Sequence, residues 1–168
     1  FLGANVVPIN ADAEAVAAFA RRARMTPRRC SSIVGPAAAV LAFYDAVGDS
    51  WGRARDVRAH QPMLAIDGDP LVSADPRLRA AVLEDLDLLF PACVAMFTEE
   101  LGISPLGVDG GAAYRRRIAT LIRQGRALLV VEDAEVLFKA EVGVVADDVA
   151  QIQGVWVDPD HRGRHISE

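Results

Sequence analysis

The spacing of apolar residues in the first part of the chain predicts alternating strands and helices. Apolar segments at 2–9, 30–34 and 57–66 are typical of strands, and Ala-rich segments at 12–24 and 36–47 are typical of helices. Asn10 is the expected cap of the first helix, and Gly48 the expected end of the second. The order predicted for this part is therefore strand, helix, strand, helix, strand.

A second unit is expected to begin near Arg77 with a strand at 78–82. A helix follows, in which apolar residues recur at helical spacing: Leu86, Leu89, Phe90, Cys93, Phe97 and Leu101. Pro91 lies inside this pattern, so the helix either starts late or kinks there. A further helix is predicted to end at Gly125.

After Gly125 the apolar pattern changes to a period of two. It predicts strands at 127–132, 136–145 and 150–157, joined by short acidic turns, which together make an antiparallel meander. Alternation places Lys139 and Glu141 on one face of the middle strand. The chain is thus predicted to be α/β, with a partial domain at 1–75 and a second domain at 76–168.

Composition and charge narrow the possible functions. Apolar residues make up 52% of the chain and the net charge is −5, so no global field attracts nucleic acid or an anionic membrane. The longest nearly apolar run, 33–44, is shorter than the ~20 residues of a membrane span. Cys30 and Cys93 could form one disulfide, but their isolation favours buried free thiols in a reducing cytoplasm. His60 and His161 lack the spacing of a metal pair.

The end of the last predicted strand carries the clearest candidate chemistry. Asp158-Pro159 ends the strand, and Arg162-Gly163-Arg164 leads toward an expected helix. Free backbone N–H groups, a helix dipole and cationic side chains in one turn suit a phosphate or pyrophosphate. The alternative is an ordinary solvated basic turn.

The segment 151–167, Gln-Ile-Gln-Gly-Val-Trp-Val-Asp-Pro-Asp-His-Arg-Gly-Arg-His-Ile-Ser, resembles the acetyl-CoA-binding strand and pyrophosphate loop of GNAT-type N-acetyltransferases. The order of elements from Arg77 onward is similar to that family: a strand, two helices, a meander of the second to fourth strands in a mixed sheet, and a loop of pattern Gln/Arg-x-x-Gly-x-Gly/Ala. Segments 30–36, 94–100 and 138–143 resemble an actinobacterial group with an N-terminal domain of unknown function before the GNAT domain.

This resemblance implies an acyl-CoA-dependent N-acyltransferase that moves an acetyl group from acetyl-CoA to a small-molecule or peptide amine. Its cofactor-binding positions correspond here to Val155, Trp156, Val157, Arg162, Gly163, Arg164, His165 and Ser167. His165 stands where the family has glycine, and a positive φ there would strain a histidine by about 1–3 kcal/mol. Ser167 stands at the small Gly/Ala position.

The general base is less well defined. Some GNAT enzymes use a glutamate on the strand that here carries Gln151 and Gln153. Glu141 is the leading candidate, with Glu99 and Glu100 as alternatives. A non-catalytic CoA-binding or regulatory module is the alternative function.

The chain is expected to be a fragment of a tandem GNAT-like protein, because Glu168 falls where the loop should turn into a helix. The fragment is therefore expected to be inactive alone. The first domain is interpreted as a degenerate GNAT-like repeat, since the loop at 7–12 has no glycine and arginine pattern. Neither the acceptor nor the oligomeric state can be read from the pattern.

Overall fold

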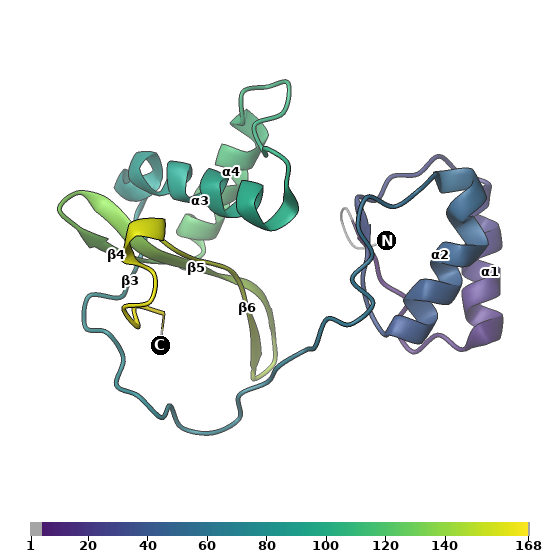
Figure 1. Ribbon diagram of the computed structural model, residues 1–168, viewed down its shortest axis with the longest axis horizontal. Coiled ribbons are helices and arrows are strands. Elements are labelled where there is room, and N and C mark those ends of the chain that lie inside the picture. Colours follow the sequence, from purple (N-terminus) through teal and green to yellow (C-terminus); the bar gives the residue numbers. More distant parts are fainter. Residues whose placement is uncertain (1–4, 168) are drawn as a thin grey trace. The chain divides into compact units, whose positions relative to one another are not determined.

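The computed structural model describes residues 5–167, which form two compact units, one ending at Asp67 and the other beginning at Gly68 (Figure 1). The first unit pairs two helices, α1 (Ala13–Arg24) and α2 (Ala37–Trp51), with two short parallel strands, β1 (Asn5–Val6) and β2 (Ser32–Ile33). Its core consists of Val16, Ala20, Ala23, Ala39, Phe43 and Val47.

Both helices of this unit differ from the prediction at one end. Asp12 caps α1, because its carboxylate accepts a hydrogen bond of 2.8 Å from the Ala15 N–H. Asn10, the expected cap, lies in a turn with φ +47°. Gly48 does not end α2, which continues to Trp51 and buries Val47 in the core.

The strand predicted at 57–66 is wrong, since the chain between Trp51 and Arg79 contains no helix or strand. Met63, Leu64 and Ile66 are 97%, 87% and 92% exposed. A strand is stable only where a neighbour completes its hydrogen bonds and covers an apolar face, and no such neighbour lies beside this segment. Of the strand predicted at 2–9, Asn5–Val6 forms, and 2–4 lie outside the described residues.

The second unit has the predicted α/β architecture. Its strands are β3 (Arg79–Ala80), β4 (Ala127–Glu132), β5 (Glu135–Ala146) and β6 (Val149–Val157), in the order β3-β4-β5-β6 with every pair antiparallel. The meander is confirmed. Two helices, α3 (Leu86–Leu101) and α4 (Ala112–Arg123), lie on one face of this sheet (Figure 1). Short 3-10 helices, η1 (Leu83–Asp85) and η2 (Pro159–His161), precede α3 and follow β6.

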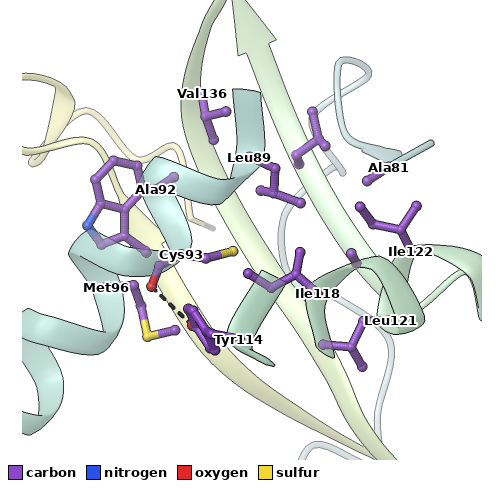
Figure 2. Close-up of a cluster of buried hydrophobic side chains, with 13 residues drawn as sticks. Ala81, Leu89, Ala92, Cys93, Met96, Tyr114, Ile118, Leu121, Ile122 and Val136 are labelled. Atoms are coloured by element: carbon purple, nitrogen blue, oxygen red, sulfur yellow. Dashed lines mark hydrogen bonds between the residues drawn. The ribbon is translucent and has the colours of Figure 1, made fainter. Parts of the chain in front are cut away.

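The core of the second unit lies where α3 and α4 meet the sheet (Figure 2). Leu89 of α3, Ile118 of α4 and Leu129 of β4 are at most 1% exposed and meet there. The helix α3 begins at Leu86, so it does not start late to avoid Pro91. None of the helices within residues 5–167 is long and apolar enough to cross a membrane.

Two irregularities interrupt the pairing of β5 with β6. Glu141 pairs with Gln153 and Lys139 with Trp156, so the Gly154-Val155 pair lies opposite Ala140 alone. This is a β-bulge in β6. One step further along, Gly143 is the extra residue in β5. Its missing side chain makes room for Gln153, whose side-chain amide would overlap a Cβ at that position.

Candidate functional site

A pocket of about 440 Å³ lies between the C-terminal half of α3 and the end of β6. The helix contributes Met96, Glu99 and Glu100, the strand contributes 155–157, and η2 and the following loop contribute residues from His161 onward. Seven of the eight residues predicted to bind the cofactor line this pocket, and Arg164 is the exception. The structure therefore brings the strand and loop of the sequence motif together on one side of α3.

Arg162 connects the loop to α3 through hydrogen bonds. Its two terminal nitrogens donate to Glu99 Oε1 and Oε2 at 2.8 and 2.7 Å, and its Nε donates to the Val157 carbonyl at 3.1 Å. The Arg162 guanidinium lowers the pKa of the Glu99 carboxyl by hydrogen bonding. A phosphate could use this guanidinium only by displacing Glu99, because the bidentate pair occupies the face suited to an oxyanion.

The loop after Arg162 contains two residues with positive φ. Gly163 has φ +75°, which suits glycine, whereas His165 has φ +59°. The expected strain at His165 is therefore present in the backbone, at about 1–3 kcal/mol for a non-glycine residue in this region. His161 and Ile166, which the motif had not singled out, also line the pocket.

Trp156 forms the inner wall of the pocket and is 9% exposed. Its indole Nε1 is buried and meets no acceptor at hydrogen-bond distance among the described residues, although the indole helps to lower the pKa of Glu99. The indole therefore lies close enough to the Glu99 carboxylate to act on it, and this carboxylate is its candidate acceptor.

The β6 bulge lies beside this inner wall. Gly154 has φ +55°, and a Cβ there would be 3.2 Å from both Met96 Cε and Lys139 Nζ and 3.4 Å from Glu141 Cδ. Only glycine combines this conformation with so close an approach. Because Met96 and Val155 line the pocket, the bulge adjoins it, although Gly154 itself is not one of the lining residues.

Glu141, the predicted base, lies behind the bulge and does not line the pocket. It is 4% exposed, and its carboxylate accepts hydrogen bonds from Lys139 at 2.8 Å, Arg117 at 3.3 Å and Gln153 at 3.4 Å. Burial alone would raise the pKa of Glu141, but the charge and hydrogen bond of Lys139, together with Arg117, lower it below its usual value. Such a carboxylate is a weak proton acceptor, and the same holds for Glu99, whose pKa Arg162 lowers. Glu99 and Glu100 differ from Glu141 in that they line the pocket.

The buried cluster around Lys139 was not anticipated. Its Nζ lies 3.7 Å from Cys93 Sγ, and burial raises the pKa of the Cys93 thiol to about 11. Tyr114 donates to the Cys93 carbonyl at 3.1 Å (Figure 2), and burial also raises the pKa of its phenol. Both cysteines are buried free thiols, as predicted. Among the described residues, no group of three His, Cys, Asp or Glu side chains could hold a metal ion.

Two of the comparisons with known proteins found a match. A crystal structure of a GCN5-related N-acetyltransferase from Kribbella flavida is similar at 25% identity and a TM-score of 0.41, over 54% of this chain. The chain spans 23% of the length of that protein. No curated protein matches the chain. The family described as "Domain of unknown function (DUF4081)" matches residues 1–89, which is more than half of the chain, and the chain belongs to that family.

Proposed function

We propose that this chain is the acyl-CoA-binding part of an N-acyltransferase, which transfers an acetyl group from acetyl-CoA to an amine. The observation that carries the proposal is the bulge at Gly154-Val155, which adjoins, through Val155, a pocket formed by β6, the following loop and α3. A bulge takes backbone groups out of the strand ladder, so that they can bind an oxygen of a ligand.

The strand beyond the bulge suits the elongated arm of coenzyme A. β6 is the last strand of the described sheet. One of its edges pairs with β5, and the other pairs with no strand of the described sheet. Backbone groups on an open edge can pair with an amide-containing ligand in the manner of an added strand. Val155 to Val157 also line the pocket and supply an apolar wall.

The loop is less suited to the pyrophosphate. Gly163 permits a close approach of the backbone, but Glu99 and Glu100 add negative charge, and Arg162 is already paired. Phosphate binding would therefore require Arg162 to exchange Glu99 for the ligand. We expect weak CoA affinity, with a strong dependence on salt.

In the proposed reaction the acceptor nitrogen attacks the thioester carbonyl carbon, and the C–S bond then breaks to release the CoA thiolate. Backbone N–H groups at the bulge would stabilise the oxyanion that develops on the carbonyl oxygen. The acceptor ammonium must first lose a proton, and Glu99 or Glu100 lies closer to the pocket for this role than Glu141. The base remains a prediction.

Binding can be tested through Trp156. In the Trp51→Phe variant, Trp156 is the only tryptophan, so its fluorescence reports the pocket directly. Titration with acetyl-CoA should change this signal in a saturable way, and Gly163→Val should weaken binding because its φ of +75° is unfavourable for valine. The exposed Gly68→Ala change, where nothing lies within 4 Å of the added Cβ, is the matched control. Absence of saturable binding at low salt would refute the proposal.

A non-catalytic CoA-binding or regulatory module is the second candidate. It is favoured by the paired state of Glu141 and by the strained His165 in the loop. Incubation of the chain with acetyl-CoA and a panel of amines, followed by detection of free CoA thiol, separates the two. Binding without thiol release for any amine would support the module.

We also propose that the first unit is a degenerate GNAT-like repeat with a packing or substrate-shaping role. The parallel pairing of β1 with β2 across α1 supports this interpretation. Deletion of residues 1–67 should then leave acetyl-CoA binding intact, and loss of binding in a deletion variant that remains folded by circular dichroism would contradict it.

A further inference from the structure

We propose that Lys139 is a positioning residue for the thioester carbonyl, because its buried ammonium lies directly behind the Gly154 bulge. This inference rests on the proposed function and adds to it a residue outside the pocket. Backbone groups at the bulge would contact the carbonyl oxygen, and the ammonium would act on that oxygen through the bulge.

Lys139 is an unusual residue in this chain. Of its 18 basic Lys and Arg side chains, only position 139 is lysine, and that side chain is 1% exposed. Burial of a charged group costs free energy, and an apolar residue of similar volume often stabilises the folded state equally well. The placement of a lysine here is therefore not explained by packing alone.

The neighbours of Lys139 hold its ammonium in one place. Its Nζ donates to Glu141 Oε1 at 2.8 Å and lies 3.7 Å from Cys93 Sγ. The Glu141 carboxylate is in turn held by Arg117 and Gln153. Because Glu141 is shared with Arg117, this one carboxylate does not cancel the charge of the Lys139 ammonium, which is the cation beside the bulge.

The ammonium lies beside the bulge, on the side to which a Gly154 side chain would point. A Cβ at Gly154 would lie 3.2 Å from Lys139 Nζ, so no side chain separates the charge from this part of the β6 backbone. Glu141 Cδ is slightly farther, at 3.4 Å. A fixed positive charge in a region shielded from water stabilises negative charge that develops nearby, and it needs no rearrangement during the reaction.

Arginine could not take this position without rearrangement. Its planar guanidinium is larger than an ammonium and carries five N–H donors that require acceptors. The space beside Gly154 is filled by Met96 Cε and Glu141 Cδ, each within 3.4 Å of the position of an added Cβ. A compact point charge fits there.

The test compares acetyl-CoA with S-ethyl-CoA, a thioether that has no carbonyl oxygen. The Lys139→Met/Glu141→Gln double variant removes both charges and avoids leaving a buried carboxylate unpaired. We expect it to bind acetyl-CoA about fivefold more weakly while its affinity for S-ethyl-CoA stays within about twofold. Infrared difference spectra should show that the bound thioester carbonyl stretch is shifted less toward low wavenumber than in the unmodified chain.

The matched control is Arg77→Met/Glu132→Gln, which removes one positive and one negative charge from the surface of the second unit and also takes Arg77 from Asp75. It should leave both affinities and the carbonyl stretch unchanged. If the Lys139 double variant loses affinity for both nucleotides equally, or keeps the carbonyl shift of the unmodified chain, the inference is wrong while the proposed binding function stands. Absence of binding of either nucleotide to the unmodified chain would overturn both. The Lys139→Arg variant, folded by circular dichroism, should show a reduced carbonyl shift, and a full shift would also count against the inference.

Discussion

Replacement of Gly154 by alanine tests how closely the β6 bulge lies against the buried charges of β5. The positive φ of +55° should strain an alanine by about 1–2 kcal/mol. The added methyl group would also lie 3.2 Å from Lys139 Nζ and from Met96 Cε. Met96 can move its terminal carbon, but Lys139 can move only by weakening its 2.8 Å bond to Glu141, which adds about 1 kcal/mol.

Gly102→Ala separates the two contributions. Gly102 has a similar φ, +67°, and lies in the same unit, but nothing lies within 4 Å of its added Cβ. It should therefore show the conformational strain alone, about 1–2 kcal/mol. Gly154→Ala should destabilise the second unit by about 2–3 kcal/mol, so the difference between the variants measures the contact with Lys139 and Met96.

The measurement is urea unfolding of both variants in the Trp51→Phe background. Trp156 fluorescence follows the second unit, and far-ultraviolet circular dichroism follows the whole chain. A difference of about 1 kcal/mol corresponds to about 0.5 M urea in the midpoint for a typical small domain. If the urea midpoint of Gly154→Ala equals or exceeds that of Gly102→Ala, the added methyl group does not crowd Lys139 and Met96, and the reasoning is refuted.

Three further predictions concern the loop and the pH dependence. His165→Gly should raise acetyl-CoA affinity in calorimetry while changing the free energy of unfolding by less than about 1 kcal/mol. The glycine relieves backbone strain in the folded state, but it also gives the unfolded chain more conformational freedom, and these two effects on stability oppose each other. Unchanged affinity would contradict this prediction. Glu99→Gln should raise affinity severalfold more than the neighbouring Glu100→Gln, because only Glu99 forms the bidentate pair with Arg162; equal effects would count against a competing ion pair. Arg79 lowers the folded-state pKa of Asp85 below its unfolded value of about 3.9, so this stabilisation is complete at neutral pH and is lost as pH falls through the folded pKa. Thermal melts from pH 7 to 2 should therefore show a weaker acid dependence for Asp85→Asn, and an unchanged slope would exclude this contribution.

The site was only partly predictable from the sequence. The strand and loop that form one side of the pocket follow each other in the chain, so a motif could identify them. The other side comes from α3, and the contact between Glu99 and Arg162 joins residues 63 positions apart. Glu141 illustrates the same limit: alternation correctly placed it on one face with Lys139, but its pairing and its burial behind the bulge depend on α4 and β6.

The sequence by itself determined the elements whose stability is local. The period-two strands of the meander formed within one residue of their predicted bounds, because short turns such as Asp133-Ala134 connect strands that pair with their immediate neighbours.

Only the tertiary structure decided the features that depend on distant partners. The segment 57–66 has the composition of a strand but forms none and stays exposed, because no neighbouring strand completes its hydrogen bonds. The one lysine of the chain became a buried charge beside a bulge, because the register shift at Gly154 brings the backbone of β6 against it. Local patterns specify which elements form, whereas pairing and packing between distant segments determine which charges are buried and what they face.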